Sequence, residues 1–172
     1  VLNKLRPYLY GNSKKFLHNA KFDKHMFIRH GYDIGGFLHD TQVAMQVLNE
    51  NEMSKRLKDL LTKYKHHLGF TEDSYTFEQL FGKNAPFHEV PLEVAYIYAC
   101  KDTHGCYLLG KWQEKFLNAR EGLKNIFYNI ESPLLPVVVD MERTGMLLDM
   151  QFADKYEKEL ADYLKELEAI IR

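Results

Sequence analysis

The sequence predicts a helix-rich α/β fold. Residues 14–18 and 35–39 are short stretches that contain apolar residues and lie beside glycines or polar residues, which is typical of short strands. Most of the remaining chain places apolar residues three and four positions apart, the spacing of one face of an α-helix. Capping residues precede several of these stretches, so we expect a series of short helices and one long helix.

The composition fits an intracellular protein with a buried core. The chain has 172 residues, of which 45% are hydrophobic, and its net charge is −1. The absence of a basic excess counts mildly against a high-affinity binder of duplex nucleic acid, but not against an enzyme that handles a short strand end. No apolar run approaches the ~20 residues that span a bilayer. Cys100 and Cys106 fit no common metal-site spacing, so we expect reduced, packed thiols.

The first part of the chain contains a polar pair at the start of a helix. Residues 2–9 predict a helix that stops at Gly11, and a second helix follows Asn19 and ends near residue 31. Asn19 and Asp23 lie one turn apart, near the positive end of the helix dipole. The simplest interpretation is that Asn19 caps the helix and Asp23 favours its first turn. Its buried face is expected to contain Phe22, Met26 and Phe27.

Three further helix starts follow. Asp40, with Thr41, is expected to be the N-cap of a helix carrying Val43 and Val47, although a third functional carboxylate is the alternative at Asp40. Ser54 is expected to cap the next helix, whose core face consists of Leu57, Leu60, Leu61 and Tyr64. After a polar loop at 68–75, Thr76 and Gln79 form a capping box for a short helix that ends at Gly82.

The long helix begins at Pro91 and runs to about Leu117. Tyr98 and Asp102 are four residues apart and therefore share one face of this mostly apolar helix. A carboxylate can bind a divalent metal ion and a phenol can orient a water molecule. The alternative is a structural contact between Tyr98 and Asp102 at the helix edge.

A new segment is expected after a boundary at residues 118–122. Its apolar run, residues 134–139, has the composition of a strand, and Asp149 is expected to cap a final amphipathic helix. That helix repeats apolar residues at alternating four- and three-residue spacing, which predicts packing against another helix. The repeating residues are Tyr156, Leu160, Tyr163, Leu167 and Ile170.

These pieces together resemble a known family. Asn19-x-x-x-Asp23 and Tyr98-x-x-x-Asp102 resemble the second and third motifs of the 3′–5′ exonuclease domain of family A, polymerase-I-like, DNA polymerases. Ile130-Glu131-x-Pro133-Leu134, followed by Met141-Glu142-x-x-Gly145, resembles the start of the polymerase domain in that family. The resemblance covers nearly the whole chain. It divides the chain into the C-terminal part of an exonuclease domain, residues 1–121, and the start of a polymerase domain, residues 122–172.

The resemblance implies a fold and a chemistry. The fold is the ribonuclease-H-like exonuclease fold, N-terminally truncated and helix-rich, followed by the helical start of the polymerase domain. The family uses two divalent metal ions, Mg²⁺ or Mn²⁺, to hydrolyse phosphodiesters. By motif, Asp23 and Asp102 are the metal carboxylates, Tyr98 orients the attacking water, and Asn19 supports the substrate or the motif helix.

One part of the family pattern is missing. The family's first motif, Asp-x-Glu, lies upstream of the other two, whereas Asp140-Met141-Glu142 lies downstream of both and is rejected as its equivalent. The chain begins with Val1 rather than Met, which predicts an excised piece of a longer protein or a processed chain. The two-metal site is therefore expected to be incomplete, and this piece alone is expected to show little nuclease activity.

The function expected of the parent protein is DNA-directed DNA polymerisation with 3′–5′ proofreading. Its partners are then the single-stranded 3′ end of DNA and deoxynucleotides. We expect a monomer in the cytoplasm of a bacterium or a phage-infected host, without membrane attachment. Two alternatives are a free-standing exonuclease of the ribonuclease D type and a domain that binds single-stranded DNA ends without cleaving them. The polymerase-like segment after Gly122 argues against the ribonuclease D type.

Overall fold

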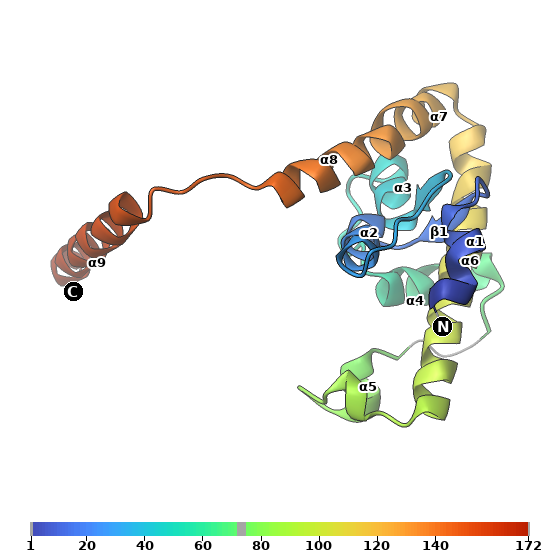
Figure 1. Cartoon of the computed structure of the whole chain (residues 1–172), viewed down its shortest axis with the longest axis horizontal. Helices are drawn as coiled ribbons and strands as arrows, with labels where there is room; N and C mark the ends of the chain where they lie inside the picture. The colour runs from blue at the N-terminus through green and yellow to red at the C-terminus, as the bar shows by residue number, and fades with distance from the viewer. Residues whose placement is uncertain (1, 72–74, 172) are drawn as a thin grey trace. The chain divides into compact units, whose positions relative to one another are not determined.

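The computed structural model describes residues 2–71 and 75–171, and it confirms an α/β architecture that is mostly helical with a small sheet (Figure 1). Two compact units divide the chain, the first ending at Val139 and the second beginning at Asp140. The ribonuclease-H-like fold stays a prediction, because two short strands define no sheet order beyond their own pair. Residues 72–74, part of the loop expected at 68–75, lie outside the described residues.

The sheet consists of two parallel strands, β1 (Lys15–Leu17) and β2 (Leu38–Asp40). Both strands were expected from the sequence. Their register pairs Lys15 with Leu38 and Leu17 with Asp40, so both strands end at the same edge. Because the carboxyl ends of parallel strands meet there, the chain segments that follow the two strands start side by side.

Three helices accompany this sheet. They are α1 (Leu2–Tyr10), α2 (Ala20–Arg29) and α3 (Thr41–Leu48), and all three were predicted. The buried face predicted for α2 is wrong, because Phe22 is 57% and Met26 39% exposed. The residues that α2 buries are Ala20 and Lys24. The long side chain of Lys24 remains buried because its ammonium pairs with Asp33.

The long helix α6 (Leu92–Asn118) is the element on which α3, α4 (Leu57–Leu68) and β1 pack. Two glycines permit this close packing. A Cβ at Gly105 would lie 2.4 Å from Leu61 Cδ1, and a Cβ at Gly110 would lie 2.2 Å from Phe16 Cδ1. These glycines therefore cost helix propensity but let α4 and β1 approach the helix. One core cluster on this face comprises Met45, Leu60, Leu61, Leu68, Phe70 and Leu109.

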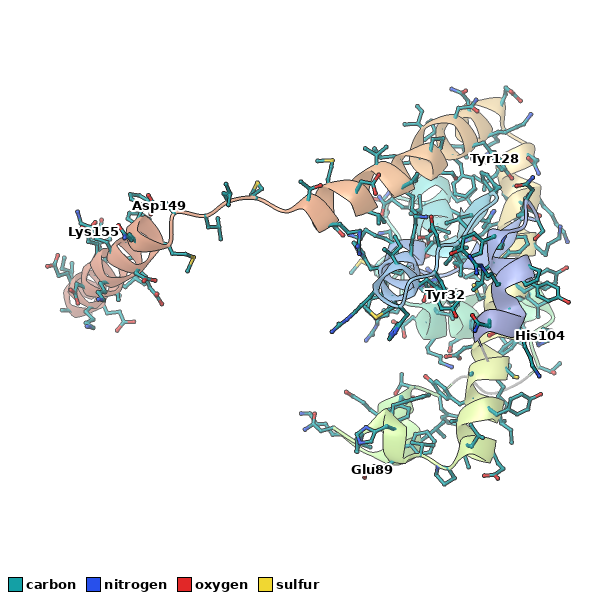
Figure 2. All side chains as sticks on the ribbon, viewed as in Figure 1. Tyr32, Glu89, His104, Tyr128, Asp149 and Lys155 are labelled. Carbon is teal, nitrogen blue, oxygen red and sulfur yellow. The ribbon has the colours of Figure 1, made fainter. Side chains whose placement is uncertain are left out.

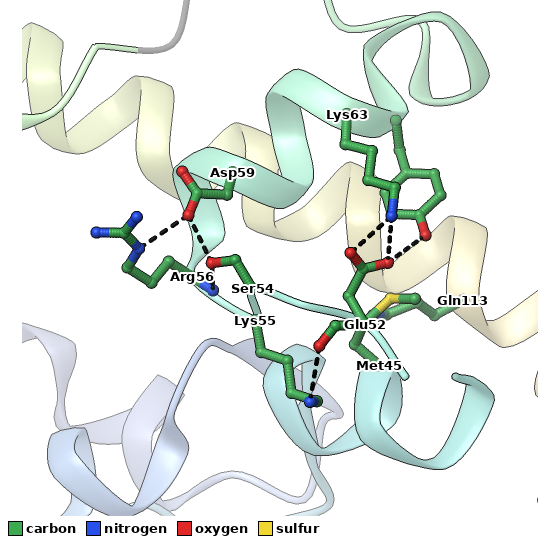
Figure 3. A network of polar contacts seen from close by, with 9 residues as sticks. Met45, Glu52, Ser54, Lys55, Arg56, Asp59, Lys63 and Gln113 are labelled. Atoms are coloured by element: carbon green, nitrogen blue, oxygen red, sulfur yellow. Dashed lines mark hydrogen bonds and ion pairs between the residues drawn. The ribbon is translucent and has the colours of Figure 1, made fainter. Parts of the chain in front are cut away.

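The start of α4 differs from the prediction. The helix begins after Arg56 with no side-chain cap, so Ser54 is not its N-cap. The Ser54 hydroxyl instead donates to Asp59 Oδ2 at 2.5 Å (Figure 3). In the same network the buried Glu52 carboxylate accepts hydrogen bonds from Lys63 Nζ and from the Tyr64 hydroxyl. These bonds fix the loop between α3 and α4.

A short excursion separates α4 from α6. The capping box is confirmed: Thr76 Oγ1 accepts from the Gln79 N–H, and the Gln79 side chain accepts from the Thr76 N–H. The excursion contains α5 (Phe77–Phe81) and the 3₁₀ turn η1 (Phe87–Glu89). The ring of Phe77 meets that of Tyr98 edge-on, with the centroids 6.0 Å apart. This contact anchors the excursion to α6.

After α6 the chain continues as helix across the boundary between the two units at Val139 and Asp140. The elements are α7 (Glu121–Ile126), the π-helical turn η2 (Phe127–Glu131) and α8 (Ser132–Thr144). The apolar run at 134–139 is thus helical rather than a strand, although it contains Pro136. The domain boundary near residue 121 stays a prediction. Together with Ala44 and Leu117, the fully buried Phe127 forms a second core cluster.

The second unit consists mainly of α9 (Met150–Ile171). Its predicted cap is confirmed, since Asp149 Oδ1 accepts from the Phe152 N–H at 3.0 Å. The ring of Phe152 stacks on that of Tyr156, with the centroids 5.7 Å apart. Across the described part of the chain, no helix is long and apolar enough to cross a membrane.

Candidate active site

The predicted site residues come from two elements of the first unit, the start of α2 and the N-terminal half of α6. Asn19 is the residue before α2, and its backbone adopts the left-handed conformation with φ 63°. Its side chain makes no capping bond and is exposed, so the capping interpretation of Asn19 is wrong. The exposed amide is therefore available to an external group.

Asp40 makes the capping bonds that Asn19 does not make. Its carboxylate accepts from the N–H groups of Asn19 and Ala20 at 3.1 and 2.7 Å, at the start of α2. It also accepts from the N–H groups of Gln42 and Val43 at 2.9 and 3.4 Å, which confirms it as the N-cap of α3. Because the strands end side by side, one buried carboxylate caps both helices.

Asp23 lies one turn into α2 and is half-buried. Burial and, to a lesser extent, the negative charge of Asp40 together raise the pKa of its carboxyl group from 3.8 to about 6. A carboxylate in this environment favours a nearby cation, because a positive charge would offset both effects.

Tyr98 and Asp102 lie one turn apart on α6, and both are half-buried. Burial raises the pKa of the Tyr98 phenol, and the charge of Asp102 and a hydrogen bond with it act in the same direction. A lysine from α4 joins this pair: the Lys58 ammonium pairs with Asp102 Oδ1 and lies 4.6 Å from the centroid of the Tyr98 ring. No sequence pattern pointed to Lys58, because its contact depends on how α4 packs on α6.

The thiol of Cys106 lies one turn beyond Asp102 and is buried. Burial raises its pKa to about 11, against the opposing effect of a hydrogen bond with Thr41. The charges of Asp40, Asp23 and Asp102 also contribute to this raised pKa. That Asp23 and Asp102 share one site stays a prediction.

A cavity of about 270 Å³ adjoins Tyr98. Its wall combines apolar surface with two phenols and two ammonium groups. Such a lining suits a nucleotide, since a base stacks on aromatic and apolar surface and a phosphate pairs with lysine. The lining residues are Lys58, Tyr75, Leu80, Val94, Ile97, Tyr98 and Lys101. Figure 2 labels His104, which lies further along α6 and has its ring centroid 6.1 Å from that of Phe70.

The predicted site residues are of a type that binds divalent metal ions, but they are too few to complete a metal centre. Asp23 and Asp102 offer the hard oxygen ligands that Mg²⁺ and Mn²⁺ prefer. However, within residues 2–71 and 75–171 no group of three or more His, Cys, Asp or Glu side chains could hold a metal ion. Asp40 is occupied by backbone N–H groups and Asp102 by Lys58. A complete metal centre therefore needs ligands beyond these two carboxylates.

Residues 1–115 match the 3′–5′ exonuclease family, and the chain belongs to that family. This match confirms the resemblance that the two motifs indicated.

The relatives of this chain are polymerases. It is 32% identical to DNA polymerase I of Chloroflexus aurantiacus over 97% of its own length and 18% of the relative's. It is 33% identical to DNA polymerase I of Synechocystis sp. over 98% of its length and 17% of that relative's. A phage protein, DNA polymerase DpoZ of Acinetobacter phage SH-Ab 15497, is 29% identical over 83% of the chain and 24% of its own length. The chain thus spans under a quarter of each of these relatives.

Proposed function

We propose that this chain is part of a DNA polymerase I and carries the portion of its proofreading exonuclease that contains Asp23, Tyr98 and Asp102. The observation that supports this most is the Tyr98–Asp102 pair beside a cavity with lysine and phenol groups, in a chain of the 3′–5′ exonuclease family. The substrate would be the single-stranded 3′ end of DNA. Deoxynucleotides would be substrates of the polymerase portion.

Each site residue has a role in this proposal. The carboxylates of Asp23 and Asp102 would hold Mg²⁺ or Mn²⁺, together with ligands from outside the described residues. When bound, these ions would acidify a water molecule and offset charge on the phosphate. The Tyr98 hydroxyl would orient the attacking water, and the Asn19 amide would contact the substrate strand.

The wider assignments are also proposals. Residues 1–121 would belong to a ribonuclease-H-like exonuclease domain and residues 122–172 to the start of the polymerase domain. The similarity to DNA polymerase I relatives over 97–98% of the chain supports this division, because it extends beyond the exonuclease match at residue 115. It also argues against a free-standing exonuclease of the ribonuclease D type. The protein would act as a monomer in the cytoplasm.

The role of Tyr98 is tested by Tyr98→Phe in the full-length protein. The ring remains, so its edge contact with Phe77 is kept and only the hydroxyl is lost. Positioned proton-transfer groups are typically worth ~10²–10⁴-fold, and a water-orienting phenol should lie at or below the lower end. Single-turnover hydrolysis of a labelled single strand should therefore slow markedly, yet less than in Asp23→Ala. A rate within twofold of wild type would remove Tyr98 from the mechanism.

A second candidate function is binding of single-stranded ends without cleavage. The pairing of Asp102 with Lys58, and the lack of a three-ligand group within the described ranges, favour this alternative. The two functions separate in one experiment with the full-length protein and a single-stranded oligonucleotide in Mg²⁺. Shortening of the strand from its 3′ end supports the exonuclease. Retention of an intact strand in a stable complex supports binding alone.

A further inference from the structure

Lys58 contacts both candidate catalytic side chains of α6 although it comes from a different helix. Its ammonium group pairs with Asp102 Oδ1 and lies 4.6 Å from the centroid of the Tyr98 ring. Both partners of the ion pair are partly shielded from water, with 16% of the Lys58 side chain and 27% of the Asp102 side chain exposed. An ion pair shielded in this way is weakened less by salt than a fully exposed one.

The packing of α4 on α6 explains why this contact forms. Leu61 lies three residues after Lys58 on α4, and Gly105 lies three residues after Asp102 on α6. A Cβ at Gly105 would clash with Leu61 Cδ1 at 2.4 Å, so the absence of a side chain lets the two helices approach closely at this point. The same approach brings the start of α4 to Asp102. The contact between Leu61 and Gly105, one turn away, therefore places Lys58 beside Asp102.

The cation that pairs with Asp102 is Lys58. Asp59, the next residue on α4, is bonded to Ser54 and Arg56 instead (Figure 3). The charge of Asp102 also reaches His18, but burial lowers the pKa of this histidine, which favours its neutral form at pH 7. Lys101 lines the same cavity as Lys58.

We propose that Lys58 is a resident cation that competes with a divalent metal ion for Asp102. The lysine holds the carboxylate in position while no metal is bound, and it must withdraw before a metal ion can take the same oxygen. Its flexible four-carbon stem allows such a withdrawal. The inference rests on the proposed function, in which Asp102 is a metal carboxylate, and it adds a positioning residue that lowers the metal affinity.

The test measures lanthanide binding rather than activity. Tb³⁺ prefers carboxylate oxygens, and its luminescence is excited through a nearby tyrosine ring such as Tyr98. The full-length protein is titrated with Tb³⁺ as wild type, Lys58→Met and Asp102→Asn. The component of the signal that disappears in Asp102→Asn reports the site. Lys58→Met removes a competing charge that is partly shielded from water. The Tb³⁺ affinity of the Asp102-dependent component should therefore rise by roughly fivefold or more.

Two controls separate the local charge from other effects. Lys58→Arg keeps the positive charge and should retain the weak wild-type affinity. Lys124→Met removes the same charge from the exposed pair with Glu121 on α7 and should leave the affinity unchanged. If Lys58→Met binds Tb³⁺ no more tightly than wild type while the signal still depends on Asp102, the role of Lys58 is overturned. The metal role of Asp102 then stands. A signal that does not depend on Asp102 in any variant overturns the proposed metal role of Asp102, and the inference with it.

Discussion

At the scale of single residues, Asp40 determines how the start of α2 is presented. Its carboxylate accepts backbone hydrogen bonds from the starts of both α2 and α3. The sequence predicted its bonds to α3, because an Asp immediately before an apolar periodic stretch is typical of an N-cap. Its bonds to α2 could not be predicted, because they span about 20 residues and depend on the register of β1 with β2.

Replacing Asp40 tests this double role. Asp40→Asn keeps the size but replaces one acceptor oxygen by a donor, which would face a backbone N–H. We expect the free energy of unfolding to fall by about 2–3 kcal/mol, more than the ~1 kcal/mol typical of a single N-cap. Thermal or urea unfolding measures the loss. Asp149→Asn, at the single cap of α9, is the matched control. Equal losses in the two variants would contradict the double role.

His39 is a buried base that the sequence did not single out. Its side chain is fully buried beside Phe127, with ring centroids 4.9 Å apart, and Gln113 lies at hydrogen-bond distance. Burial lowers the pKa of His39 from 6.5 to about 4, and the hydrogen bond that Gln113 Oε1 accepts from the imidazole opposes this shift. The folded state therefore disfavours the protonated imidazole. The contribution of neutral His39 to the free energy of unfolding is fully present above pH 6.5 and is lost as the pH falls toward 4.

This linkage gives a measurable pH dependence. From the two pKa values, His39 should account for a loss of about 2 kcal/mol in the free energy of unfolding between pH 7 and pH 5. His39→Gln cannot titrate, so its stability should fall correspondingly less over the same interval. The exposed His66 on α4 provides the control, since His66→Gln should keep the wild-type slope. Identical slopes for wild type and His39→Gln in denaturant titrations would contradict the account.

At the scale of elements, the positions of the helices could be predicted from local sequence signals. The packing between the helices could not be predicted in this way. The capping box at Thr76 and the cap at Asp149 are local, and both were predicted correctly. The role of Ser54 was predicted wrongly because Asp59, five residues on, competes for its hydroxyl. The apolar run at 134–139 resembles a strand in composition, yet it lies within α8, because periodicity cannot separate a short buried strand from a helix.

Gly110 tests whether close packing or helix propensity decides the composition of α6. An alanine there would gain about 1 kcal/mol of propensity, but its Cβ would lie 2.2 Å from a ring carbon of Phe16. Overpacking of this kind costs about 1–3 kcal/mol, so Gly110→Ala should be destabilising overall. Gly122 on α7 has open space around its Cβ position, and Gly122→Ala should be neutral or stabilising. Urea unfolding of both variants decides, and a stabilised Gly110→Ala would show that β1 does not require the glycine.

At the scale of the whole molecule, the sequence motifs identified the family while the structure identified the surroundings of the site. The two motifs, Asn19 to Asp23 and Tyr98 to Asp102, are readable because each lies on one helix face. Lys58 and the cavity beside Tyr98 arise from separate elements, so the sequence alone could not predict them. The chain spans 15–18% of these DNA polymerase I relatives, so its activity is best measured in the full-length protein.

The most direct test of the central proposal is Asp102→Asn in the full-length protein, assayed for both 3′–5′ hydrolysis and nucleotide addition. Loss of a metal-binding carboxylate should lower single-turnover hydrolysis of a single strand by at least about 100-fold. Nucleotide addition should stay within twofold of wild type. Asp140→Asn, in the Asp-x-Glu sequence rejected as a motif, should alter neither activity. Wild-type hydrolysis in a folded Asp102→Asn variant, or equal loss of both activities, would contradict the account.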